Sequence, residues 1–376
     1  MLASILVSYS VHAIVGLMIG CTANSDSVEP PEVSAKTARI VYVIPANASP
    51  KPDYQARLES FATRTEKFIS NWMTYWERPI EREQFFARDS NGDVQITLVK
   101  VSLQGGPKGR NSIGPLRKLA IDSASKKLKL KKNARVVWWI FYDYPGVIGF
   151  RGGGNSFWGG TAINAYPGGK GPIDQNADLA SPKVNGTQIK GSIHELGHAL
   201  GLPHNGPRME LKLGNSLMGA TTPKFAKRVN SKEFRVYLND ASSALIWKHP
   251  LFRNGGSKPE LPKRLQIKNL DVTEEKNGKI TVSGVLDSNL TAHSAVVFNT
   301  SRDKVGDYWG RSHTGKVDED GKFAVSLWSP HTKGNLFLAF CFHNGTNTAD
   351  SKKRKSFLKI AYTGKTGQRK FKLPSK

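Results

Sequence analysis

The first half of the chain carries apolar residues in two kinds of pattern, which predict strands that alternate with helices. Short apolar runs at residues 39–44, 94–103 and 135–142 have the length of strands, and the last run, RVVWWIFY, is apolar enough to be buried on both faces. Residues 54–76 and 111–130 show near-helical spacing, and the second of these helices is very basic. This alternation favours an α/β subdomain with a twisted, mostly parallel sheet.

The second half shows a different pattern of short apolar runs separated by turn signals such as Asn277-Gly278 and Asp320-Gly321. Such spacing predicts an all-β sandwich of roughly 110 residues, immunoglobulin-like or fibronectin-like in general shape. The expected strands cover residues 265–270, 279–286, 295–299, 322–328, 336–342 and 357–362. Residues 231–247 are expected to form the last helix before this sandwich.

One segment between these halves indicates specific chemistry, His194 to His204, with the sequence HELGHALGLPH. Its pattern is H-E-x-x-H-x-x-G-x-x-H. On a helix, His194 and His198 lie one turn apart on the same face, where two imidazoles can bind one Zn²⁺ ion. Glu195 is then placed to reach a water on the metal rather than the metal itself. The alternative, that these are ordinary helix residues, is disfavoured because five positions match at once.

Gly201 is expected to end this helix, because a residue without a β-carbon readily adopts a left-handed conformation. The chain reversal would bring His204 round as the third ligand. Three protein ligands and an open fourth position are typical of a catalytic zinc site, whereas structural sites are usually closed by four ligands.

The motif and the segment Asn215-Ser216-Leu217-Met218-Gly219 downstream resemble the metzincin clan of zinc endopeptidases, whose signature is this motif followed by a Met-turn. The resemblance covers roughly residues 38–250. It implies that Met218 lies beneath the metal as a hydrophobic base, although Met218 alone would suggest a plain core residue. It also implies peptide hydrolysis with one catalytic Zn²⁺ held by three histidines and Glu195 as the general base for the attacking water.

Residues 146–171 are rich in glycine, and Gly160, Thr161, Ala162 and Ile163 are the candidate edge strand above the cleft. In metzincins such a strand holds an extended substrate by main-chain pairing. A flexible surface loop explains the composition equally well.

The chain of 376 residues has a formal net charge of +25. The positive electrostatic field around such a chain attracts polyanions, among them acidic polysaccharides and anionic envelope surfaces. A solvated cationic surface is an equally good explanation. Specific nucleic-acid binding is not expected, because the basic runs lack interleaved aromatic residues and no DNA-binding spacing is present.

The apolar leader indicates export, and Leu17 to Cys21 resembles a lipobox. Lipidation at Cys21 is slightly favoured over a secretory signal, an uncleaved anchor or a mis-set start codon. Two departures weaken it, because the leader has no Lys or Arg before the apolar run and Met18 is atypical for a lipobox. With only two cysteines, a disulfide framework is not expected. The protein is expected to be lipid-anchored to the cell envelope or secreted, to contact membrane only through that anchor, and to be a monomer.

The predicted organisation is therefore a leader (1–21), a flexible tether (22–37), a metzincin-like zinc protease domain (38–250), a linker (251–263) and a β-sandwich (264–376). The expected activity is zinc-dependent endopeptidase cleavage of a protein or peptide. The alternative is a non-catalytic surface protein that retains zinc and docks acidic polymers through its charge.

Overall fold

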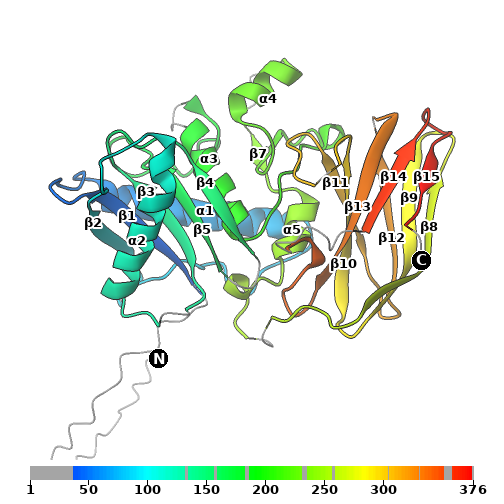
Figure 1. The fold of residues 1–376 in the computed structure, drawn as a ribbon, viewed down its shortest axis with the longest axis horizontal. Helices are drawn as coiled ribbons and strands as arrows, with labels where there is room; N and C mark the ends of the chain where they lie inside the picture. Colours follow the sequence, from blue (N-terminus) through cyan, green and yellow to red (C-terminus); the bar gives the residue numbers. More distant parts are fainter. Residues whose placement is uncertain are drawn as a thin grey trace, which may run out of the picture. The chain divides into compact units, whose positions relative to one another are not determined.

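The computed structural model describes residues 37–131, 134–155, 159–182, 186–230, 235–255, 259–303, 305–329, 331–350 and 358–374. The predicted leader, its lipobox and the tether up to residue 36 lie outside the described residues. The structure forms a mixed α/β protein whose helices fall in the first two thirds of the chain (Figure 1).

The first sheet has five strands in the order β2-β1-β3-β5-β4. Its strands are β1 (Ala38–Pro45), β2 (Ile96–Val101), β3 (Val137–Tyr142), β4 (Arg151–Asn155) and β5 (Gly159–Ala165). The first four in spatial order are parallel, and β4 runs antiparallel to β5. The predicted strands at the start of the chain are thus confirmed, with small differences at their ends.

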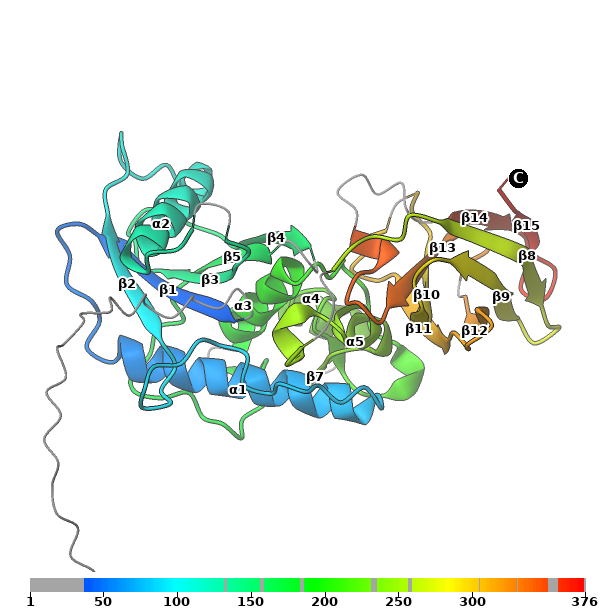
Figure 2. The same ribbon diagram turned by 90° about the horizontal axis from the view of Figure 1, so that it is seen from below.

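Helices cover both faces of this sheet because its central strands are apolar on both sides (Figure 2). One face packs on α1 (Tyr54–Tyr75) and α3 (Gly186–Ala199), and the other packs on α2 (Ile113–Lys127), which follows a short 3-10 turn at Arg110–Ser112. In β1, Tyr42 belongs to the first core and Val43 to the second, as the two-residue period of a strand requires.

The predicted edge strand Gly160, Thr161, Ala162 and Ile163 is placed differently by the structure. These residues lie in β5, which pairs with β3 on one side and β4 on the other. The edge of the sheet is therefore β4. The sequence misled because Arg151–Asn155 contains three glycines and no apolar alternation, so no strand is expected there.

After α3, the chain contains short elements only. They are the 3-10 turn Met209–Leu211, β6 (Asn215–Ser216), α4 (Thr222–Val229), β7 (Val236–Tyr237), α5 (Asp240–Ile246) and the 3-10 turn Pro250–Phe252. Residues 231–234 of the helix expected over 231–247 lie outside the described residues. Val236–Tyr237 is a strand that pairs in parallel with Asn215–Ser216, so the helix is confirmed only over Asp240–Ile246. The Asn239 side chain then accepts a hydrogen bond from the backbone N–H of Ser242, so α5 begins there.

The C-terminal part consists of two antiparallel sheets, with strand orders β11-β10-β13-β14-β15 and β12-β9-β8. The strands are β8 (Leu265–Glu274), β9 (Lys279–Ser288), β10 (Ala292–Thr300), β11 (Arg311–Lys316), β12 (Lys322–Trp328), β13 (Lys333–Phe342), β14 (Leu358–Thr363) and β15 (Lys370–Lys372), with a 3-10 turn at Thr348–Asp350. Val282, Val325 and Phe340 belong to one buried cluster that both sheets share. The six strands expected from the sequence are present, whereas β11 and β15 were not expected.

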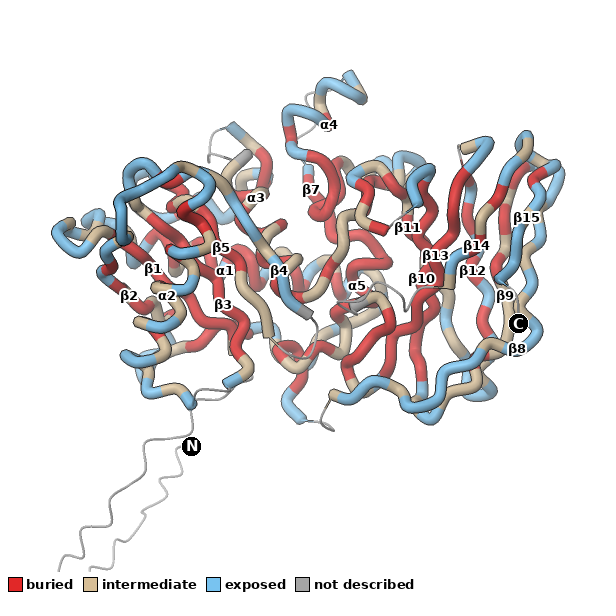
Figure 3. Tube along the Cα trace, in the orientation of Figure 1, coloured by how far each residue is buried: buried red, intermediate tan, exposed pale blue. Residues whose placement is uncertain are grey.

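The strands β10 and β13 at the centre of the larger sheet are buried on both faces (Figure 3). Val296 and Ala339, which point away from the smaller sheet, belong to the same buried cluster as Leu245 of α5 and Met218. The apolar core therefore continues from the first sheet to β10 and β13, which fixes the sandwich against the elements that follow α3. The domain boundaries expected from the sequence stay a prediction. No helix in the described part of the chain is long and apolar enough to cross a membrane.

Candidate metal centre

The helix that carries the histidines, α3, is held firmly against the sheet. Ile189, Ile193, Leu196 and Ala199 recur on one side of the helix and are at most 1% exposed. The indole N–H of Trp139 in β3 donates to the carbonyl oxygen of Ser192, at 3.1 Å. The other faces of α3 are thus free to present His194, Glu195 and His198 in fixed positions.

The structure brings His194, His198 and His204 together, with one nitrogen from each ring within 4.8 Å of the others. Nδ1 of His194 lies 2.8 Å from the carbonyl oxygen of Leu217, and Nδ1 of His198 lies 2.7 Å from that of Leu202. Since a carbonyl oxygen only accepts, both Nδ1 atoms carry the proton, and both Nε2 atoms present lone pairs. Nε2 of His198 lies 2.9 Å from Nε2 of His204. This donor set fits one metal ion.

Gly201 brings His204 back to the helix, as the sequence suggested. Its φ is +89°, and the N–H groups of Gly201 and Leu202 donate to the carbonyl oxygens of His198 and Gly197, at 3.0 and 2.9 Å. These two bonds form the Schellman motif that ends many helices at a left-handed glycine.

Met218 is fully buried and packs against Gly197 of α3, between His194 and His198 in the sequence. Leu217, its neighbour, orients the His194 ring through the bond above, and the backbone N–H of Asn205 donates to the carbonyl oxygen of Met218 at 3.2 Å. The turn at Asn215–Gly219 therefore contacts both α3, through His194, and the segment that follows His204.

Burial perturbs the titratable groups around the histidines. Burial raises the pKa of Glu195 to about 7, and the backbone N–H of Gly152 in β4 opposes that rise. Burial, followed by the neighbouring His198 and Lys190, holds the pKa of His194 well below its usual range, so this ring is neutral and able to bind a metal. A carboxyl group whose pKa is near 7, next to a cluster of neutral imidazoles, is suited to act as a general base.

Lys190, one turn before His194, was not expected from the sequence. It is 3% exposed, and its ammonium donates to the carbonyl oxygens of Gly219 and Ala220, at 3.4 and 2.9 Å. Burial lowers its pKa to about 7. The bonds connect α3 to the end of the turn that contains Met218.

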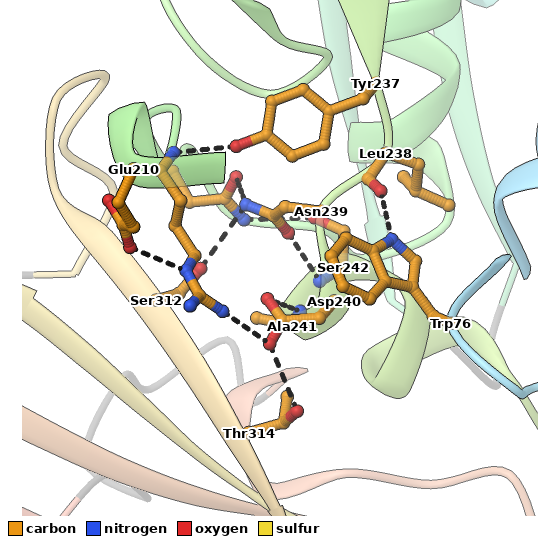
Figure 4. Close-up of polar contacts among 12 residues, drawn as sticks. Trp76, Glu210, Tyr237, Leu238, Asn239, Asp240, Ala241, Ser242, Ser312 and Thr314 are labelled. Atoms are coloured by element: carbon orange, nitrogen blue, oxygen red, sulfur yellow. Dashed lines mark hydrogen bonds and ion pairs between the residues drawn. The ribbon is translucent and has the colours of Figure 1, made fainter. Parts of the chain in front are cut away.

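A buried polar network fixes the chain beyond His204 (Figure 4). Asn205 donates to the Ser242 hydroxyl at 3.0 Å and accepts from the Asn239 amide at 2.5 Å, and Asn239 also contacts Ser312 of β11 at 3.3 Å. Asp240 accepts from Thr314 of β11 and Arg208, each at 3.2 Å. The sandwich strand β11 thus contacts the chain segment that follows the third histidine.

A second residue missed from the sequence is Tyr308, which comes from the loop between β10 and β11. Its ring centroid lies 3.9 Å from that of His204 and 6.1 Å from that of His194. Burial and the Glu195 carboxylate raise the pKa of Tyr308. Tyr308 follows His204 by about a hundred positions, so no local pattern could have assigned it to this site.

No family model and no curated protein matches the sequence. Solved structures do match it. Wild-type OgpA from Akkermansia muciniphila, in one crystal form, is 20% identical with a TM-score of 0.67, and the match covers 90% of this chain and 96% of OgpA. This chain has the OgpA fold.

Two further OgpA structures agree. Catalytically inactive OgpA in complex with an O-glycopeptide substrate, glycodrosocin, is 19% identical with a TM-score of 0.67, over 90% of this chain and 96% of that chain. Wild-type OgpA in another crystal form is 20% identical with a TM-score of 0.66, over 90% and 95%. The likeness to OgpA extends over both the first sheet and the sandwich.

Proposed function

We propose that this protein is a zinc-dependent endopeptidase of the metzincin type. The observation that carries the proposal is the convergence of three histidine nitrogens within 4.8 Å, beside the half-buried carboxyl group of Glu195, whose pKa is raised to about 7. A donor set of three imidazoles with room for a fourth ligand favours catalytic Zn²⁺. A zinc ion held there would act as a Lewis acid on water and on the peptide carbonyl group.

Glu195 has the base role in this proposal. Its carboxylate takes a proton from the attacking water and passes it to the leaving amine, which a group with a pKa near 7 can do in both directions. His194 and His198 hold their rings in one tautomer through Leu217 and Leu202, so they bind the metal without reorganisation. Met218, which packs against Gly197 of the same helix, has the role of the hydrophobic base of the site in this proposal.

Strand β4 is the proposed substrate-binding edge, in place of the segment expected from the sequence. Arg151–Asn155 pairs with β5 on one side, and no strand in the described part of the chain pairs with its other side, where an extended peptide could add as a further strand. A β-carbon at Gly152 would lie 2.8 Å from a carboxylate oxygen of Glu195, so a peptide paired with β4 would pass directly over the base.

The substrate class proposed is an O-glycosylated peptide, because OgpA shares this fold and was crystallised with an O-glycopeptide substrate. The test is a pair of peptides of identical sequence, with and without an O-linked sugar on a serine or threonine. Cleavage of the glycosylated member alone supports this class. Equal cleavage of both supports the endopeptidase proposal and contradicts the glycopeptide preference.

The experiment that tests the endopeptidase proposal combines metal content with proteolysis. Purified full-length protein is analysed for zinc and incubated with casein and the glycopeptide pair, with and without a chelator. One zinc per chain and chelator-sensitive cleavage support the proposal. Bound zinc without cleavage, together with salt-sensitive binding to an acidic polysaccharide, would favour the alternative in which the net charge of +25 serves docking.

A further inference from the structure

The C-terminal sandwich contributes a loop to the three-histidine site. Residues 305–310 belong to the connection between β10 and β11, and the ring of Tyr308 packs on His204 in a tilted arrangement, with 3.9 Å between ring centroids and 32° between ring planes. The side chain is nevertheless 40% exposed. One face of the ring therefore packs on a candidate metal ligand while part of the side chain stays open to solvent.

The loop is held in place from inside the sandwich. Asp307 accepts from the hydroxyl of Thr300 in β10 and from the backbone N–H of Trp309, both at 3.0 Å. The carbonyl oxygen of Asp307 accepts from the N–H of Gly310 at 3.1 Å. These three bonds surround Tyr308 in the sequence, so its position does not depend on its own side-chain contacts.

The loop is also fixed from the catalytic side. The N–H of Gly206, two residues after His204, donates to the carbonyl oxygen of Gly310 at 2.5 Å. A β-carbon on Gly206 would lie 2.7 Å from the Cα of Trp309, so only glycine permits this approach. The guanidinium of Arg228 in α4 lies over the Trp309 ring, 4.0 Å from its centroid. Tyr308 is thus placed by contacts on both sides.

The hydroxyl of Tyr308 makes no hydrogen bond with any residue in the described part of the chain. A phenol on a loop anchored from both sides, packed on a candidate metal ligand and partly exposed to solvent, is a prepared hydrogen-bond donor of the kind that stabilises an oxyanion. Strand β4 contacts Glu195 and His198, whereas Tyr308 contacts His204. The proposed base, Glu195, comes from α3, and the Tyr308 hydroxyl comes from the connection between β10 and β11, so the two groups reach the site from different elements.

We propose that the Tyr308 hydroxyl donates a hydrogen bond to the carbonyl oxygen of the scissile peptide bond as that oxygen gains negative charge, which makes the sandwich part of the active site. The proposal rests on the endopeptidase function proposed above. The donor keeps its proton throughout, and the bond strengthens as water attacks the carbonyl carbon.

The test removes only the hydroxyl, with Tyr308→Phe in the full-length, zinc-loaded protein. We expect kcat/KM to fall by roughly 10²–10³-fold, the loss seen when one oxyanion donor is removed. Zinc content and melting temperature should be unchanged, because the ring remains on His204. Tyr75→Phe, at an exposed tyrosine of α1, is the matched control and should keep wild-type kinetics.

A binding readout separates this role from substrate capture. A phosphinic peptide, which mimics the tetrahedral intermediate, should bind Y308F more weakly by a factor comparable to the loss in kcat/KM. The parent peptide should bind E195Q and the E195Q/Y308F double variant with equal Kd. If removal of the Tyr308 hydroxyl weakened the binding of the phosphinic peptide and of the parent peptide by the same factor, the oxyanion role would be overturned.

Two other results would contradict the proposal and differ in meaning. If wild type cleaves peptide and Y308F does so within twofold, the Tyr308 role alone is overturned. If zinc-loaded wild type cleaves no peptide and binds no phosphinic peptide, the endopeptidase proposal fails as well.

Discussion

Gly197 of α3 lies so close to Met218 that a β-carbon on Gly197 would be 2.6 Å from the methionine sulfur. This contact places the turn directly against the helix between His194 and His198. In an exposed helix, replacing glycine by alanine stabilises by up to about 1 kcal/mol. At Gly197 we expect the opposite, because the added methyl group overpacks a closed contact and costs about 1–3 kcal/mol.

The measurement is the free energy of unfolding of Gly197→Ala, with zinc affinity measured on the same samples. Gly191→Ala, one and a half turns earlier in α3, is the control, since the nearest atom to its β-carbon is Cε1 of Phe150 at 3.9 Å. We expect G191A to be neutral or stabilising. A G197A protein as stable as G191A would show that the turn does not support the helix as described.

Two neighbouring glycines of β4, Gly152 and Gly153, allow a similar comparison between a glycine in close contact and one in open space. A β-carbon on Gly152 would lie 2.4 Å from the carbonyl oxygen of Glu195 and 2.8 Å from Cβ of His198, whereas one on Gly153 would meet nothing within 4 Å. We expect Gly152→Ala to push β4 away from α3 and to lower kcat/KM at least tenfold. Gly153→Ala should remain within about threefold of wild type, because a displacement of about 1 Å matters only on the side that faces the site. Equal kinetics for both variants would contradict the proposed role of β4.

Stability should fall in acid because of buried histidines far from the metal site. Burial lowers the pKa of His249 and of His313 to about 3. Between that value and the ordinary 6.5, the unfolded chain binds more protons than the folded chain, so the free energy of unfolding decreases as pH falls through this window. Each such histidine contributes a slope of about 1.36 kcal/mol per pH unit.

His249→Asn tests this pH dependence. Nδ1 of His249 accepts from the N–H of Leu251 at 3.1 Å, and an asparagine oxygen can take the same bond without titrating. Urea unfolding from pH 7 to pH 4 should show a shallower loss of stability in H249N than in wild type. Parallel curves would mean that His249 is not the neutral buried group described here.

The fold and the histidine site were accessible from the sequence where the signal is local. The alternation of apolar runs gave β1, β2, β3 and the helices between them, since strands buried on both faces are continuously apolar. Helix spacing and one left-handed glycine placed His194, His198 and His204 together. Each of these inferences depends on residues within about a dozen positions of one another.

The rest depends on contacts between distant segments. Three of the five residues of β4 are glycines, and β-carbons on Gly152 and Gly154 would collide with α3, so the strand lacks a strand-like composition. Tyr308 reaches His204 only because β10 shares a core with α5 and β11 is hydrogen-bonded to the start of α5. From the sequence, Lys190 would be taken for a surface lysine of a basic protein. In the structure it is buried and donates to the carbonyl oxygens of Gly219 and Ala220, which lie about 30 positions away.

The most direct test of the central claim is a comparison of wild type with Glu195→Gln. Both proteins should contain one zinc per chain and unfold at the same temperature, because Glu195 contacts no histidine nitrogen in the described hydrogen bonding. Wild type should cleave the O-glycopeptide, and the variant should lose at least about 10³-fold in kcat while still binding it. Full cleavage by a zinc-loaded Glu195→Gln protein would contradict this account.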